Sequence, residues 1–141
     1  MKEKSLKMGS PLTTAEIAFK KDSHAWGRLT TSVRARPEEV LAFLWDTMRR
    51  SKQKEDDLEK CVEERVNGRN ICIYIKKRTP KIIANRDFLG RAVWKKEGEG
   101  FVLVTSPEES EARPITGGVV RGKYPSAWRI KRKNDRETTL E

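Results

Sequence analysis

The sequence has few of the residues that build metal sites or acid–base catalysts: two cysteines and one histidine among 141 residues. Cys61 and Cys72 are too far apart for a metal-binding knuckle, and we expect both to be reduced, half-buried thiols. His24 lies in a predicted turn, 22–24, where nothing fixes a partner for general-base chemistry. No nucleophile, phosphate-loop or zinc motif is present either. The sequence therefore predicts no metal, no cofactor and no enzymatic activity.

Long apolar runs are also missing. No run approaches the length that spans a bilayer. The basic residues 1–8 are followed by Gly9, Ser10 and Pro11 rather than by an apolar segment, so they do not form a secretory signal. With so few cysteines, the expected compartment is a reducing one. The sequence thus predicts a cytoplasmic protein.

Charge, by contrast, is abundant and unbalanced. Thirty-one Lys and Arg against 21 Asp and Glu give a net charge of +10, and charged residues (37%) outnumber hydrophobic ones (35%). This composition predicts one domain with a thin core. Residues 1–14 are polar and aperiodic, so we expect a flexible tail followed by a single domain over 15–141. A basic protein favours an anionic partner, although many of these charges can simply keep the surface soluble.

The arrangement of the expected strands centres on residues 85–105. Two β-branched and aromatic runs there flank a polar segment containing Gly98 and Gly100, which predicts a β-hairpin with a longer loop. Asn67-Gly68 predicts a second hairpin with a type I′ turn, in which Val62 lies opposite Ile73. The expected strands are residues 15–20, 26–35, 61–66, 69–75, 85–94, 101–105, 119–132 and 137–141.

One helix is predicted over residues 37–50. Pro37 suits the first helical position, and Glu38 and Glu39 follow where the helix dipole favours negative charge. An apolar stripe with helical spacing comes next, formed by Val40, Leu41, Leu44, Trp45 and Met48 and widened by Ala42 and Phe43. Propensity alone would extend the helix through residues 51–59. The order of elements predicts an α+β fold, a curved antiparallel sheet packed on one amphipathic helix.

Several stretches in this order resemble the START domain, the lipid-transfer domain related to steroidogenic acute regulatory protein. Arg86-Asp87-Phe88 is the most specific of them. The resemblance covers residues 26–141 and rests on residues 33–46, 76–80, 85–88, 91–94, 106–110, 120–121 and 124–130.

The resemblance implies a helix-grip fold, in which an antiparallel sheet curls around a long C-terminal helix and a tunnel between them holds one lipid. The sequence reaches Glu141 inside an expected strand. We therefore expect a C-terminally incomplete START-like fold that lacks this helix. The resemblance also implies that the helix over 37–50 packs against an end or edge of the sheet.

The resemblance also suggests residues for lipid binding: Arg86, Asp87, Phe88, Trp94 and Arg121. Because side chains alternate along a strand, Phe88 and Trp94 share a face with Arg86, and Asp87 points to the other. The charged residues could instead form ordinary ion pairs, and the aromatic ones an ordinary core.

The expected partner is a lipid or sterol, and an anionic membrane could contact the basic residues Lys76, Lys77 and Arg78. These three could equally be a solvated strand end. Alternative functions are a basic nucleic-acid-binding domain, or a protein-interaction module whose last strand awaits a partner. The sequence leaves the oligomeric state open.

Overall fold

A computed structural model of the chain describes residues 2–19, 25–50 and 54–141. One sheet has the strand order β1-β2-β3-β10-β9-β7-β6-β5-β4, and β8 pairs with β6 outside this path. All pairings are antiparallel except the one between β6 and β8. The strands are β1 (Lys2–Leu6), β2 (Thr13–Phe19), β3 (Ala25–Val33), β4 (Asp57–Asn67), β5 (Asn70–Lys77), β6 (Asn85–Glu97), β7 (Gly100–Pro107), β8 (Val119–Arg121), β9 (Ser126–Arg132) and β10 (Thr138–Leu140).

The predicted helix is confirmed as α1 (Pro37–Arg49). Its first turn is capped by Glu39, whose Oε2 accepts a hydrogen bond of 2.8 Å from the backbone N–H of Arg36. The predicted widening of the apolar stripe is wrong, because Ala42 and Phe43 point to solvent and Phe43 is 68% exposed. The predicted extension of the helix is also wrong: residues 51–53 lie outside the described residues, and β4 begins at Asp57.

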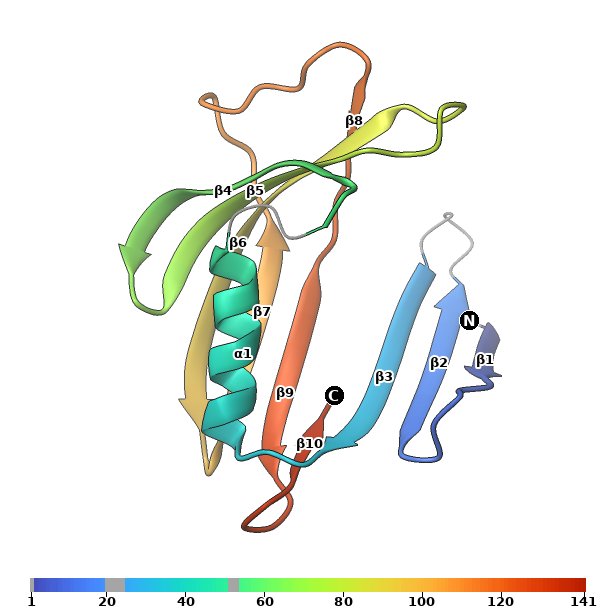
Figure 1. Ribbon diagram of the computed structural model, residues 1–141, viewed down its shortest axis with the longest axis vertical. Helices are drawn as coiled ribbons and strands as arrows, with labels where there is room; N and C mark the ends of the chain where they lie inside the picture. The colour runs from blue at the N-terminus through green and yellow to red at the C-terminus, as the bar shows by residue number, and fades with distance from the viewer. Residues whose placement is uncertain (1, 20–24, 51–53) are drawn as a thin grey trace.

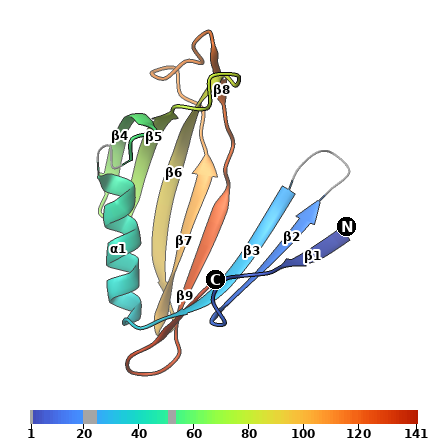
Figure 2. The same cartoon turned by 45° about the vertical axis from the view of Figure 1, so that its right-hand side comes forward.

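The sheet is curved, and α1 lies on its inner face (Figures 1 and 2). Trp45 packs there in one buried cluster with residues of β5, β6 and β7, namely Ile71, Ile73, Ala92 and Leu103. Val40 and Leu41 pack in a second cluster with Ile130 of β9. The helix therefore covers the inner face itself, so the expectation that it packs against an end or edge is wrong. On the outer face, Cys72, Tyr74 and Leu89 form a separate cluster.

The central hairpin is confirmed as β6 and β7, with Glu97 paired to Gly100. Its loop has two residues rather than the longer connection predicted, and Gly98 provides the positive φ (57°) of the turn. Gly100 has a different role. A Cβ at this position would lie 1.9 Å from the carbonyl oxygen of Ile130, so only glycine allows β9 to approach this closely.

The second hairpin is confirmed in part. Val62 pairs with Ile73 as predicted, but two register shifts follow within β4, the first between Val62 and Glu64. They leave Gly68 and Arg69 as the two residues of the turn, one position later than predicted. Gly68 does not have positive φ, so the predicted type I′ turn is wrong.

The two ends of the chain lie in different parts of the sheet. Strand β1, in the segment predicted as a tail, pairs with β2 at one edge. The division into a tail and a domain over 15–141 stays a prediction. Strand β10 lies inside the sheet, paired to β3 on one side and β9 on the other. The expectation of an unpaired last strand is therefore wrong for β10. The predicted turn at His24 lies outside the described residues.

Two features of the second half are absent from the predicted strand list. Residues 119–132 form two strands rather than one, separated by residues 122–125, and the first of them, β8, pairs parallel with the start of β6. Within the part of the chain that the structure describes, α1 is the only helix. The predicted class, a curved antiparallel sheet with one helix and without the long second one, is confirmed.

Candidate functional site

Aromatic side chains of neighbouring strands gather on the inner face. Alternation from the buried Ala92 places Phe88 and Trp94 of β6 on this face, and Trp94 contacts both clusters beneath α1. Trp128 of β9 packs against the same core. The prediction that Phe88 and Trp94 share a face is confirmed.

Trp94 is fixed by contacts on several sides. Its ring meets Phe101 edge to face, with centroids 5.8 Å apart, and the Arg69 guanidinium lies 4.9 Å from its centroid. Its indole N–H donates to the carbonyl oxygen of Gly68 at 3.2 Å. Trp94 is thus held on several sides within the inner wall.

Phe88 is held by the segment that follows β8. A Cβ at Gly122 would lie 2.3 Å from the Phe88 ring, so the backbone of Gly122 lies directly against this ring. The N–H of Gly122 also donates to the carbonyl oxygen of Asp87 at 2.8 Å. The position of Phe88 therefore depends on how firmly β8 is attached to β6.

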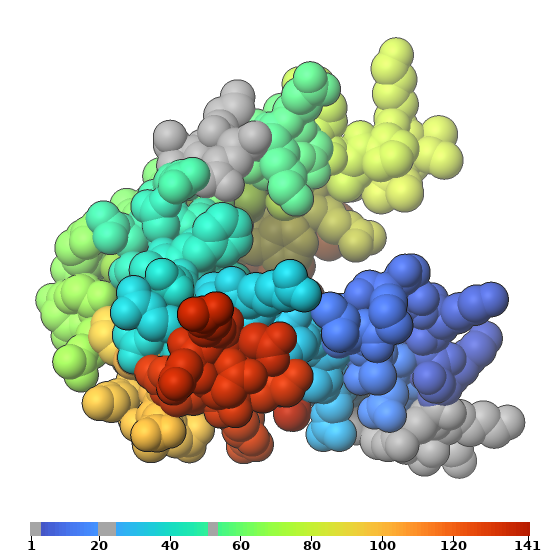
Figure 3. Space-filling view, turned by 60° about the horizontal axis from the view of Figure 1, so that its bottom comes forward, coloured from blue at the N-terminus to red at the C-terminus, as the bar shows by residue number. Residues whose placement is uncertain are grey.

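The inner face continues beyond α1 onto β2 and β3. Val33 packs against the core under α1, so alternation places Thr31 and Leu29 on the same face, with Ala15 opposite Leu29. Leu29 is 41% exposed. Figure 3 shows the molecule hollowed here, between the blue strands β1–β3 and the yellow-green chain near residue 80. Apolar side chains of the inner face therefore border an open hollow.

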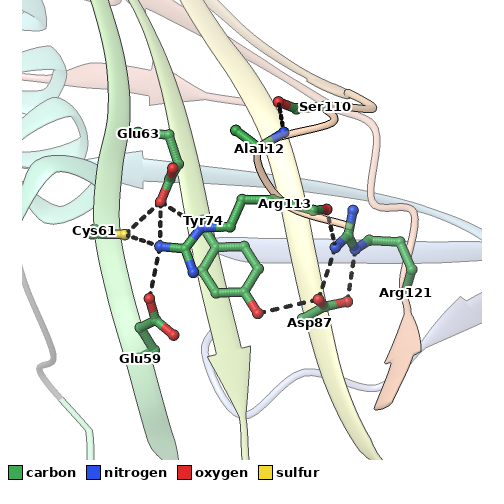
Figure 4. Close-up of polar contacts among 9 residues, drawn as sticks. All are labelled: Glu59, Cys61, Glu63, Tyr74, Asp87, Ser110, Ala112, Arg113 and Arg121. Atoms are coloured by element: carbon green, nitrogen blue, oxygen red, sulfur yellow. Dashed lines mark hydrogen bonds and ion pairs between the residues drawn. The ribbon is translucent and has the colours of Figure 1, made fainter. Parts of the chain in front are cut away.

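A buried ion pair lies on the outer face (Figure 4). Asp87, 1% exposed, accepts two hydrogen bonds from Arg121, at 2.7 Å from Nε and 2.9 Å from Nη2. The Tyr74 hydroxyl donates a third, at 3.2 Å. The hydrogen bonds from Arg121 hold the pKa of Asp87 below its usual value, although burial acts in the opposite direction. The pair joins β6 to β8 and so supports the contact between Gly122 and Phe88.

Arg113 fastens the connection between β7 and β8 to the same face. Its guanidinium lies 4.2 Å from the centroid of the Tyr74 ring, and its Nε donates to Glu63 at 2.7 Å. The carbonyl oxygen of Arg113 accepts a hydrogen bond of 3.0 Å from Arg121. Burial raises the pKa of the neighbouring Cys61 thiol to about 11, which leaves it a weak nucleophile at neutral pH.

A further cluster on the outer face centres on Arg91. Arg91 donates to Glu108 at 2.7 Å, to Asn70 at 2.9 Å and to Glu64 at 2.5 Å. Burial raises the pKa of the nearby Cys72 to about 11. The prediction of site residues missed Arg91 and Arg113. Alternation places Arg91 on the face of Asp87, but nothing in the sequence identifies its partners.

The five predicted lipid-binding residues are thus divided between the two faces. Phe88 and Trp94 lie on the inner face, whereas Asp87 and Arg121 are paired on the outer one. Arg86 is exposed at the start of β6. A lipid-binding role for each of the five stays a prediction.

The predicted membrane-facing basic residues lie at the end of β5 and just beyond it. Lys77 is held by Asp57 at 2.8 Å and Asp56 at 3.2 Å, and these hydrogen bonds raise its pKa although burial acts against them. Lys76 is half-buried and Arg78 is exposed. Of the three, Arg78 is therefore the most available to an outside partner.

Within the described ranges, no group of three or more His, Cys, Asp or Glu side chains could hold a metal ion. The one helix of the described ranges, α1, is not long and apolar enough to cross a membrane. Two surface depressions, of about 940 and 640 Å³, lie away from the apolar inner face, beside Arg34 and beside Glu109.

The curved antiparallel sheet with one helix on its inner face and, among the described residues, without the long C-terminal helix, is the architecture expected of an incomplete helix-grip fold. The START domain family model matches residues 9–141, and the chain belongs to this family. The recognition of a START domain in the sequence is confirmed. Among curated proteins, none matches the chain.

Solved structures of low sequence identity share the fold. Human STARD10 has a TM-score of 0.82 at 15% identity, and the match covers 98% of this chain and 58% of that one. Human StAR-related lipid transfer protein 5 has a TM-score of 0.75 at 18% identity, covering 98% and 68%. A STAR-related lipid transfer protein from Xanthomonas axonopodis has a TM-score of 0.72 at 15% identity, covering 99% and 80%. The chain therefore spans well under two thirds of STARD10.

Proposed function

We propose that the chain is a lipid-binding and lipid-transfer module that holds a lipid or sterol against the inner face of its sheet. The observation that carries this proposal is the apolar inner surface of the sheet, which carries half-buried aromatic rings and, on strand β3 beside the open hollow of Figure 3, the exposed Leu29. Membership of the START family and the lipid-transfer relatives support it. Such a surface lowers the cost of moving an acyl chain or sterol through water, and no bond is made or broken.

The predicted residues take different parts in this proposal. Phe88 and Trp94, together with Trp128, form the apolar wall. Arg86 contacts the polar end of the ligand, since it is exposed beside Phe88. Asp87 and Arg121 act on the ligand indirectly: their pairing holds β8, and through it Gly122, against the Phe88 ring.

The protein exchanges its ligand with membranes from the cytoplasm. Lys76, Lys77 and Arg78 bring a basic strand end to an anionic surface, where each near-surface charge contributes about 1 kcal/mol. Lys77 contributes less than the others because Asp56 and Asp57 already neutralise it. Nucleic-acid binding is not favoured, because Trp45, Trp94 and Trp128 pack in or against the core under α1, which leaves Trp26 as the only tryptophan with a largely exposed ring.

The direct test is transfer of a fluorescent phospholipid, and separately of a fluorescent sterol, from donor to acceptor vesicles by the purified chain. We expect transfer that increases with protein concentration, and a complex with one lipid in native mass spectrometry. A chain that forms no such complex and accelerates transfer of neither probe would overturn the proposal.

A further inference from the structure

The chain between β7 and β9 stays outside the core. Residues 108–125, which we call the strap, comprise the long connection after β7, the short strand β8 and the link to β9. All of them are described, and each is exposed or half-buried. Figure 1 shows the connection at the upper end of the sheet. A segment whose side chains are not buried opens locally at a lower free energy than the sheet that carries it.

Two arginines fasten the strap to the outer face of the sheet (Figure 4). Arg113 contacts two acids of β4, Glu63 at 2.7 Å and Glu59 at 2.7 Å. Arg121 holds Asp87 of β6, and its Nη2 also donates to the carbonyl oxygen of Arg113 at 3.0 Å. The attachment of Arg113 to β4 therefore supports the attachment of Arg121 to β6.

The two attachments differ in their exposure to solvent. The side chain of Arg121 is 11% exposed and its partner Asp87 is buried, whereas the side chain of Arg113 is 29% exposed. Exposed ion pairs contribute little to stability and are screened by salt, while breaking a buried pair is costly. Arg113 is therefore the more easily released of the two attachments.

The far end of the strap supports the apolar inner face. The backbone of Gly122 lies against the Phe88 ring, and its N–H donates to the carbonyl oxygen of Asp87. Val120 pairs with Arg86, so it faces inward on the same side of the sheet as Phe88, and it is 51% exposed. The strap thus forms one border of the apolar surface.

We propose that the strap is a gate for the ligand, and that Arg113 is a positioning residue that sets how often the gate opens. This inference rests on the proposed lipid-binding function. Release of Arg113 from β4 frees the connection and removes the support that its carbonyl oxygen gives to Arg121. Strand β8 and Gly122 then move away from β6, and the border beside Phe88 opens. The ligand enters or leaves through this opening while the sheet under α1 stays folded.

A gate of this kind controls the rates of ligand exchange rather than the affinity. The closed state remains the major one, so loosening the strap accelerates entry and release together and leaves their ratio almost unchanged. A residue that only contacts the ligand would change the affinity, and one that only stabilises the fold would change global unfolding.

The first test replaces Arg113 by glutamine and follows release of a fluorescent lipid by stopped flow. We expect Arg113→Gln to speed release about three- to tenfold and to change Kd less than about twofold. Higher salt should speed release more from the natural chain than from this variant, because salt screens the ion pairs that the variant lacks. Lys123→Gln is the matched control on the same strap: its side chain is exposed and lies 4.0 Å from Glu109, and its release rate should be that of the natural chain.

Amide hydrogen exchange at Gly122 tests the opening without any lipid. We expect Arg113→Gln to speed exchange there about three- to tenfold and to leave the buried Leu103 of β7 unchanged. Unchanged exchange at Gly122, or equal acceleration at Leu103, would overturn the proposal. An unchanged release rate in a variant that binds lipid would overturn it as well and leave the lipid function standing. Failure of the natural chain to bind lipid would refute that function and, with it, the gate.

Discussion

At the scale of single residues, the best-defined feature is the ion pair between Asp87 and Arg121. Both charges are mostly removed from solvent, and the carboxylate is satisfied by three hydrogen bonds. Such a pair contributes little net stability over an apolar pair, but breaking it leaves an uncompensated buried charge. Its importance here is positional, because it joins β8 to β6 beside Phe88.

Arg121→Ala is expected to lower the free energy of unfolding by about 3–5 kcal/mol, since Asp87 would remain buried without its main partner. Urea denaturation measures this change. Arg86→Ala is the matched control: Arg86 is exposed on the neighbouring position of β6, and its loss should change stability by about 0.5 kcal/mol or less. Equal effects of the two substitutions would show that the buried pair is not formed.

The same carboxylate predicts a pH dependence. The pKa of Asp87 is lower in the folded protein than in the unfolded chain, where it is about 3.9. Its contribution is therefore fully present above the unfolded value and is lost as pH falls through the lowered folded value. Urea midpoints between pH 5 and pH 2 should fall more steeply for the natural chain than for Asp87→Asn. Parallel curves would contradict the assignment.

At the scale of elements, α1 anchors the inner face of β5, β6, β7 and β9. Trp45→Ala is expected to lower the free energy of unfolding by about 3–5 kcal/mol, because the ring is buried against Ile71 and Ile73. Phe43→Ala, two positions earlier on the same helix, removes an exposed ring and should cost about 0.5 kcal/mol or less. Thermal or urea unfolding compares the two. Similar losses would mean that α1 packs through a different side.

Elements with strong local patterns could be predicted from the sequence. The helical spacing from Val40 to Trp45 and the two β-rich runs around Gly98 are local signals, and both elements formed as expected. The shifted turn at Gly68 shows the limit of such signals, because bulges earlier in β4 changed the register that the turn had to close. Residues that favour a given turn type do not determine the turn when bulges in the preceding strand shift the pairing register.

The candidate site was predictable only where it depends on alternation. Phe88 and Trp94 share a face because a strand has a period of two. The partner of Asp87 could not be derived in the same way. Arg121 reaches it through a parallel pairing between strands 34 positions apart, and Arg113 reaches Tyr74 from a long connection without regular structure. Contacts of this kind are set by tertiary packing.

At the scale of the whole molecule, the sheet has two parts that meet at one short strand. The smaller part, β1–β3, pairs with the larger part, β4–β9, only through the three residues of β10 among the described strands. Helix α1 covers the inner face of the larger part. The hollow lies between these parts (Figure 3). The proposed ligand therefore contacts both of them, including Leu29 of the smaller part.

The most direct test of lipid binding on the inner face compares two substitutions in equilibrium titrations with a fluorescent lipid. Leu29 and Val104 are 41% and 42% exposed, but alternation places Leu29 on the inner face and Val104 on the outer one. We expect Leu29→Asp to weaken binding at least about tenfold, because it places a charge against the apolar ligand, and Val104→Asp to leave binding unchanged. Equal affinities for the two variants, or a loss confined to Val104→Asp, would contradict the account.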